Sequence, residues 1–332
     1  MGMLRILAAA LLGLALGAAP AGAQGVQKIK FMEVIHSLFY SPLYIASGKG
    51  FFKEEGIDFD FIAAQGSDKA TAALLSGAAD IVLAGPETAI YIANGQSPTK
   101  IKIFAGLTAT DGSFLMSKEK METFDWSMLK GKTVLGWRKG SSPALYLEEI
   151  LRKRGIDPEK DVNIITNTAI PARVGAFMAG TADFGTFFEP DISLIEKAGK
   201  GYAIRNVGND LGQIDYTVFL TRDDYIASSP KVVQGFTNAI AKAEAWVQTA
   251  DPAEAAKVLA PYFPGVDADV LARAVVRHRE ANIWKKTPMV TPEAMTALQD
   301  LLVASAILKA DQKVAYDMIV APQFAKAVPG AK

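Results

Sequence analysis

The chain has 332 residues, with 35 basic and 35 acidic side chains, 50% hydrophobic residues and no cysteine. This length is roughly twice the commonest domain size, so we expect two compact units or one large α/β unit. A net charge of zero, without any run of Lys and Arg, argues against a nucleic-acid partner. The absence of cysteine excludes disulfides, thiolate nucleophiles and cysteine metal sites, and 2 histidines are too few for a multi-histidine site. We therefore expect neither a metal nor a cofactor.

Residues 1–23 are predicted to be a signal peptide. Arg5 is followed by an uncharged apolar run up to Pro20, and the small residues 21–23 then form a cleavage pattern. The run is short for a membrane span, and an uncleaved anchor is the alternative. Cleavage would remove one base and no acid, which changes the net charge from 0 to −1. We expect the mature chain to be free in a bacterial periplasm, and without a cysteine it cannot carry a lipid anchor.

Short β-type runs alternate with helical patterns from residue 28 to residue 207. This alternation predicts βαβ units, in which helices cover the faces of a parallel sheet. Prolines open many of the helices, at the first-turn position where the missing N–H costs nothing. Strands are expected at 28–34, 57–62, 81–84, 100–106, 132–137, 162–166, 183–188 and 202–207, and helix starts at Pro42, Ser67, Pro86, Pro143, Pro171 and Pro190.

The pattern changes after about Thr221, where strand signals stop. Residues 229–321 are predicted to form four or five amphipathic helices. Three of these helices have clear start signals, at Pro230, Pro252 and Pro292.

Two segments of the chain are similar to each other. Residues 74–81 (LLSGAADI) align with residues 177–184 (FMAGTADF), and each copy is followed by an acid beside a proline. In each copy a glycine ends a helix and an Ala-Asp pair leads into a strand. Chance similarity between two turns is the alternative, but eight aligned positions favour two similar lobes.

Polar loops follow the strands of the first half, where an open α/β sheet binds its ligands. One loop combines an imidazole, hydroxyls and aromatic rings. The next two combine glycines with helix starts, whose free amides can bind an oxygen or an anion. Each also has a purely structural interpretation as a helix cap or turn. The candidate ligand residues are His36, Ser37, Phe39, Tyr40, Gln65, Gly66, Ser67, Gly85, Pro86 and Glu87.

The second half provides a similar set. The loop 137–143 combines a glycine, two serines, two bases and a helix start, but it lacks the spacing of a nucleotide-binding P-loop. Residues 166–173 are placed opposite this loop. Glu189 lies between an aromatic strand and a proline, and we expect its carboxylate to accept an N–H from a ligand because glutamate is a poor helix cap. The candidates are Trp137, Gly140, Ser141, Ser142, Phe188 and Glu189.

The catalytic motifs that would indicate an enzyme are absent from the chain. It has no GxSxG elbow, no HExxH motif and no EF-hand loop. Glu87 and Glu189 could face each other across a cleft, so a hydrolase remains an alternative. Hydroxyls, rings and amides without a tuned acid or base favour binding over catalysis, and we expect no enzyme.

Residues 41–58, 74–81, 85–89 and 140–143 resemble the solute-binding proteins of ABC importers for nitrate, sulfonate, taurine and thiamine-pyrimidine precursors. The resemblance implies an α/β protein with the two-lobed type II fold of periplasmic binding proteins. Each lobe would be a mainly parallel sheet flanked by helices, and the C-terminal segment would be helical. The first lobe would contain residues 27–113 and 216–332, and the second lobe residues 114–215.

The resemblance also implies a function. The lobes would close on a small organic solute and deliver it to an ABC permease, as a monomer. By motif, the ligand loops would be 36–40, 65–67, 85–88, 140–142 and 187–189. The chain lacks the cysteine-rich motif of the thiamine-precursor synthases, and its two acids, Glu87 and Glu189, would repel a simple sulfonate or nitrate. We expect a flat aromatic or heterocyclic solute, with a sulfonate-like anion as one alternative and an exported sensor or synthase-like enzyme as another.

Overall fold

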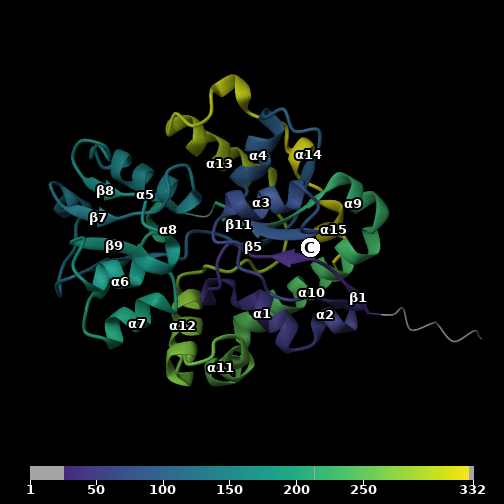
Figure 1. Ribbon diagram of the computed structural model, residues 1–332, viewed down its shortest axis with the longest axis horizontal. Helices are drawn as coiled ribbons and strands as arrows, with labels where there is room; N and C mark the ends of the chain where they lie inside the picture. Colours follow the sequence, from purple (N-terminus) through teal and green to yellow (C-terminus); the bar gives the residue numbers. More distant parts are fainter. Residues whose placement is uncertain (1–25, 213, 329–332) are drawn as a thin grey trace, which may run out of the picture.

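The computed structural model describes residues 26–212 and 214–328, so the predicted signal peptide lies outside the described residues. Two sheets, each flanked by helices, lie side by side (Figure 1). We call the sheets with their packed helices the first and the second lobe. The first sheet has the spatial order β2 (Phe31–Met32), β4 (Ile81–Ala84), β11 (Thr217–Arg222) and β5 (Ile101–Thr108). The second has the order β10 (Tyr202–Asn206), β6 (Phe114–Ser117), β9 (Phe184–Phe187), β7 (Thr133–Leu135) and β8 (Asn163–Ile165).

The chain passes between the two sheets twice. It leaves the first sheet at the end of β5, enters the second with β6, and returns from β10 to β11. The lobe boundaries expected from the sequence fall in these two connections and stay a prediction.

Both sheets are mainly parallel, as expected, and each contains one strand that runs in the opposite direction. β11 runs antiparallel to β4 and β5, and β6 runs antiparallel to β9 and β10. The reason is the double crossing: a strand that arrives from the other lobe enters its sheet at the edge where the parallel strands end. The carboxyl ends of β2, β4, β5, β7, β8 and β9 consequently lie at the edges through which the lobes are connected.

The expected strand at 57–62 is only partly formed. β3 (Ile57–Asp58) is short and pairs in parallel with β1 (Gln27–Lys28), outside the two main sheets. The phenylalanines that follow serve the core instead: the Phe59 ring lies 4.8 Å from that of Phe31 and 5.9 Å from that of Phe236. Packing of these rings replaces strand pairing in this segment.

Prolines start helices where the sequence predicts them. Asp251 caps the helix that starts at Pro252 by accepting the N–H groups of Ala253 and Glu254, and Thr291 caps the helix that starts at Pro292 by accepting the N–H of Ala294. After β11 the described chain contains helices and no further strand.

None of the described helices has the length and apolar character needed to cross a membrane. The helices are α1 (Ser41–Gly48), α2 (Phe51–Glu54), α3 (Ser67–Leu75), α4 (Glu87–Asn94), α5 (Ser142–Lys153), α6 (Arg173–Met178), α7 (Asp191–Lys197), α8 (Gly208–Leu211), α9 (Asp223–Ser228), α10 (Pro230–Thr249), α11 (Pro252–Leu259), α12 (Ala268–Glu280), α13 (Pro292–Ala304), α14 (Tyr316–Ile319) and α15 (Gln323–Lys326).

The two similar sequence segments fold in the same way. Asp80 Oδ2 accepts the N–H of Lys30 at 2.9 Å, and Asp183 Oδ2 accepts the N–H of Thr133 at 2.9 Å. Each aspartate therefore ties the strand it precedes to the neighbouring parallel strand.

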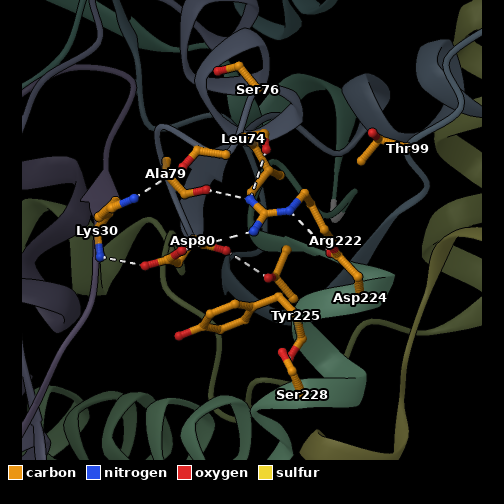
Figure 2. Close-up of polar contacts among 12 residues, drawn as sticks. Lys30, Leu74, Ser76, Ala79, Asp80, Thr99, Arg222, Asp224, Tyr225 and Ser228 are labelled. Atoms are coloured by element: carbon orange, nitrogen blue, oxygen red, sulfur yellow. Dashed lines mark hydrogen bonds and ion pairs between the residues drawn. The ribbon is translucent and has the colours of Figure 1, made fainter.

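A cation also closes the helix of each copy. Arg222 donates to the carbonyl oxygens of Leu74 and Ala79 at 3.0 and 2.7 Å, as Figure 2 shows. In the second lobe Lys118 donates to the carbonyl oxygen of Phe177, which aligns with Leu74, at 3.2 Å. A cation is favoured at a helix C-terminus by the helix dipole. In each lobe the repeated segment thus fixes the end of its helix and the start of its strand.

Candidate functional site

A cavity of about 60 Å³ lies between the lobes, at the edges where the parallel strands end. Val34, Gly85, Trp137 and Phe188 on its wall each follow a strand. The residues from the first lobe are Val34, Ile35, Tyr40, Gly66, Ser67, Gly85, Tyr216 and Thr217, and those from the second are Trp137, Arg138, Ser141, Ser142, Pro143, Thr168, Ile170, Arg173 and Phe188.

Half of the residues predicted from the sequence line this cavity. They come from all five of the predicted loops, which lie far apart in the chain. Their contact with a ligand stays a prediction. They are Tyr40, Gly66, Ser67, Gly85, Trp137, Ser141, Ser142 and Phe188.

Three predicted residues outside the cavity wall bind other parts of the protein. His36 donates from Nε2 to the carbonyl oxygen of Tyr262 at 2.6 Å, and its Nδ1 lies 2.8 Å from a carboxylate oxygen of Glu33. The backbone of Gln65 accepts Arg138 Nη2 at 3.0 Å. The carbonyl oxygen of Gly140 accepts the Tyr91 hydroxyl at 3.2 Å.

The remaining predicted residues lie just behind the wall. Phe39 stacks on Phe188, with 4.9 Å between the ring centroids and 27° between the ring planes. Pro86 precedes α4, and Glu87 is the first residue of that helix. Ser37 and Glu189 bond to each other, and the Glu189 carboxylate faces protein groups rather than the cavity. We therefore leave Glu189 out of the ligand contacts proposed below.

Three helix N-termini meet at the cavity, those of α3, α4 and α5. Gly66 precedes α3, Pro86 precedes α4 and Ser141 precedes α5, and none of these residues makes a side-chain capping bond. Free N–H groups at such positions bind anions and oxygen atoms. Gly66 has a φ of 143°, and a Cβ there would lie 1.9 Å from Arg138 Nη2. The positive φ favours glycine at this position, and a Cβ would displace the Arg138 guanidinium from it.

Arg173 brings a buried positive charge to the cavity wall. Its Nη2 donates to the carbonyl oxygens of Thr186 at 2.8 Å and Leu135 at 3.3 Å, and Nη1 donates to that of Gly136. Its Nε is buried without a hydrogen-bond partner in the described part of the chain. Burial lowers the pKa of Arg173 to about 10, so the guanidinium stays charged at neutral pH.

Aromatic rings form a large part of the same wall. The guanidinium carbon of Arg173 lies 3.9 Å from the centroid of the Trp137 ring, a cation–π contact. The ring centroid of Phe188 lies 5.3 Å from that of Trp137 and 6.4 Å from that of Tyr216. The indole N–H of Trp137 is buried and has no partner among residues 26–212 and 214–328. The wall therefore offers flat apolar surfaces together with hydrogen-bond donors.

Glu87 lies two residues after Gly85 of the cavity wall. Its side chain is 2% exposed, and Oε2 accepts the Ser142 hydroxyl from the other lobe at 2.7 Å. Burial raises the pKa of Glu87 to about 7, although hydrogen bonds from Ser142 partly oppose this. Near neutral pH the Glu87 carboxyl is therefore protonated in some molecules and charged in others.

Further contacts hold the lobes together around the cavity. Arg138 donates to Asp68 Oδ2 and to the backbone of Gln65, both at 3.0 Å. Arg152 on α5 donates to the Ser305 hydroxyl at 3.0 Å. The structure thus has the lobes closed against each other.

Several lining residues were not among the predicted site residues, and Arg173 is the most consequential, although the segment 166–173 was expected opposite the loop 137–143. Arg173 is the first residue of α6, where the helix dipole disfavours a cation. That unfavourable position was a signal for a special role. Arg138 and Pro143 lie in a loop that the sequence did identify. Thr168 and Ile170 belong to the expected segment 166–173. For Val34, Ile35, Tyr216 and Thr217 the sequence carries no comparable signal.

No three His, Cys, Asp or Glu side chains among the described residues are arranged to hold a metal ion.

Comparison with known proteins shows what the chain is similar to. Residues 39–255 match a family model described as NMT1/THI5 like. The protein named putative binding protein YtlA, from Bacillus subtilis (strain 168), is 37% identical over 305 residues, which cover 92% of this chain and 91% of that protein. A 4-amino-5-hydroxymethyl-2-methylpyrimidine phosphate synthase of Candida albicans (strain WO-1) is 25% identical over 254 residues, 70% of each chain.

Solved structures show the same fold at low sequence identity. The periplasmic nitrate-binding protein NrtA from Synechocystis PCC 6803 has a TM-score of 0.74 at 18% identity, covering 91% of this chain and 88% of that chain. The alkanesulfonate-binding protein SsuA from Xanthomonas axonopodis pv. citri has a TM-score of 0.72 at 19% identity, covering 90% and 100%. These structures confirm the predicted α/β fold of periplasmic binding proteins.

Proposed function

Because the chain belongs to the NMT1/THI5-like family, we propose that it is the substrate-binding component of an ABC importer. The observation that carries the proposal is the cavity between the lobes, whose wall contains residues of both. A solute that contacts both lobes stabilises the closed form, because it binds that form more tightly than the open form. Recognition of the closed form by a permease would then make delivery depend on the bound solute.

The lining of the cavity favours a small organic solute with a flat ring and an acidic or oxygen-rich group. The lobes would have to separate to hold it, because the cavity of about 60 Å³ is smaller than the roughly 150 Å³ cavity that binds benzene. Arg173 Nε and the indole N–H of Trp137, both buried without a partner among the described residues, would bind the oxygens. Rings of Tyr40, Trp137, Phe188 and Tyr216 would pack on the flat part. A micromolar dissociation constant corresponds to about −8 kcal/mol, which a few such contacts can supply.

The cellular part of the proposal rests on the sequence. Residues 1–23 have the composition of a signal peptide, which would export the chain to the periplasm. The partners would be the solute and the membrane subunits of a permease, and the protein would act as a monomer.

The test is a thermal-shift screen of the purified protein with sulfonates, nitrate, pyrimidines, flavins and aromatic acids. We expect aromatic or heterocyclic acids to raise the melting temperature, and isothermal titration to give one site per chain. Stabilisation by nitrate or simple sulfonates alone would exclude the flat solute. Mass spectrometry of small molecules released from freshly purified protein identifies the natural solute directly.

A second candidate is an enzyme related to the pyrimidine phosphate synthases, because relatives of that name align with 70% of the chain. Binding without chemistry is the function we favour, since the chain has no cysteine and no catalytic motif of the types considered above. Incubation of the protein with each stabilising compound separates the two functions. A bound compound that is recovered chemically unchanged supports a binding protein, and a converted compound supports an enzyme.

A further inference from the structure

Glu189 bridges the lobes beside the cavity, where α7 of the second lobe lies next to α12 of the first (Figure 1). Its side chain is 1% exposed. Oε1 accepts Nη1 of Arg277, which is on α12, at 2.6 Å. Ser193, on the helix that follows Glu189, donates its hydroxyl to Oε1 at 3.0 Å and its N–H to Oε2 at 3.1 Å. The carboxylate thus belongs to the N-terminus of α7 and reaches across to the other lobe.

The backbone of Glu189 reaches the first lobe as well. Its carbonyl oxygen accepts the Ser37 hydroxyl at 2.6 Å and the N–H of Leu38 at 3.1 Å. One residue therefore receives three hydrogen bonds from the opposite lobe, one through its side chain and two through its backbone. Separation of the lobes along this side would break all three at once.

These bonds are next to cavity residues on both sides. Phe188, which lines the cavity, immediately precedes Glu189. On the other lobe, Tyr40 lines the cavity two residues after Leu38, and the intervening Phe39 stacks on Phe188. A molecule that presses on Phe188 or Tyr40 therefore acts on the segments that carry the bridge.

We propose that Glu189 is a latch that holds the lobes closed and couples closure to occupancy of the cavity through Phe188. It is a positioning residue and does not contact the solute. The coupling to occupancy rests on the function proposed above, whereas the latch itself is a contact between two lobes that can be measured without any solute.

The charged side chains around Glu189 show why the closed form depends on Arg277. Arg277 is the cation that pairs with it, and Arg277 also donates to Glu196 Oε2 at 3.2 Å. Asp191, on the same helix as Glu196, adds negative charge nearby. A buried carboxylate is stable only with its partners in place, so loss of Arg277 disfavours the closed arrangement, while in an open form water can solvate both groups.

The test measures the distance between the lobes in the purified protein without added solute. The chain has no cysteine, so spin labels can be attached at introduced Lys200→Cys and Lys257→Cys, which are exposed positions after α7 and on α11. Pulsed electron paramagnetic resonance then gives the distribution of distances. Glu189→Gln keeps an oxygen to cap α7 but loses the charge, and Arg277→Gln removes the partner from the other side.

Asp210→Asn is the matched control. Asp210 is also nearly buried and accepts bonds from Arg154 at 2.6 Å and Arg205 at 2.6 and 2.7 Å, but all three residues belong to the second lobe. This variant removes a carboxylate from an ion-pair network without touching the contact between lobes.

We expect Glu189→Gln and Arg277→Gln each to raise the population at the longer distance roughly tenfold, as for loss of a charged hydrogen bond. Their combination should add little to either, and Asp210→Asn should match the unmodified chain. Circular dichroism verifies folding, and Arg277→Gln provides the result if Glu189→Gln does not fold. Unchanged distances in both folded variants would overturn the latch. Failure of the solute screen would refute the proposed function but would leave these distances as they are.

Discussion

The Ser142 hydroxyl, at the start of α5 in the second lobe, donates to Oε2 of Glu87, at the start of α4 in the first lobe, across 2.7 Å. The two residues are 2% and 5% exposed, for Glu87 and Ser142 respectively. Two helix N-termini therefore face each other beside the cavity, and the carboxyl between them lies near the positive end of both dipoles. Closure and solute binding should both depend on this pair.

Ser142→Ala is expected to weaken solute binding roughly tenfold, because it leaves the buried Glu87 carboxyl without its donor from the other lobe. Isothermal titration with the most stabilising compound of the screen measures the loss. Ser76→Ala is the control, since the Ser76 hydroxyl donates to the backbone of Ala73 within its own lobe and does not line the cavity. Equal effects of the two substitutions would contradict a special role for the Ser142–Glu87 bond.

Solute affinity should fall as the pH rises from about 4.5 to about 7. In the closed form burial raises the pKa of Glu87 from an ordinary 4.5 to about 7, so the closed form holds a proton that an open, hydrated Glu87 releases. Proton uptake on closure makes closure harder in this window, by up to about tenfold per pH unit. Below the open-form pKa of 4.5 Glu87 does not lower the solute affinity, and above the closed-form pKa of about 7 the loss of affinity no longer grows.

Affinities measured across this range in native protein and in Glu87→Gln test the assignment. The amide cannot titrate, so the variant should lack the decline. A decline of the same size in both proteins would assign it to another buried acid, such as Asp111, whose pKa burial also raises to about 7.

Arg173→Met should reduce the affinity for an acidic solute by about a hundredfold, because it removes the buried cation and its unpartnered Nε from the cavity wall. Uncharged compounds of similar shape should lose much less. Arg205→Met is the control, because Arg205 is a half-exposed member of an ion pair away from the cavity. Titration of both variants with an acid and with its amide checks the charge dependence. A loss that is the same for acid and amide would count against anion recognition.

Asp251→Ala should lower the free energy of unfolding by about 1 kcal/mol, because Asp251 accepts two N–H groups at the start of α11. Asp267→Ala is the comparison, since Asp267 occupies the same position before α12 and makes no capping bond; its exposed ion pair with Lys197 is of a kind that contributes little to stability. Thermal or urea unfolding of both variants gives the comparison. The capping interpretation requires Asp251→Ala to be the more destabilised of the two.

Local signals located most of the elements and about half of the cavity wall, but the sequence predicted no strand at β6 or β11. Prolines and capping residues located the starts of α10, α11 and α13, and the two similar segments located equivalent helix ends in both lobes. Loops rich in glycine and serine pointed to Gly66, Gly85 and Ser142 because strand ends and helix starts are defined by neighbours in the chain.

By itself the amino-acid sequence determined most of the helices and parallel strands, the repeated turns at 77–80 and 180–183 and the loops that lie near the cavity, because each depends on residues a few positions apart. Only the tertiary structure decided which strands run antiparallel, that Arg173 reaches the cavity and that Glu189 faces Arg277. These outcomes depend on contacts between residues that are distant in the chain; Glu189 and Arg277 are 88 positions apart. No local pattern records such a pairing, because it exists only when the two lobes meet.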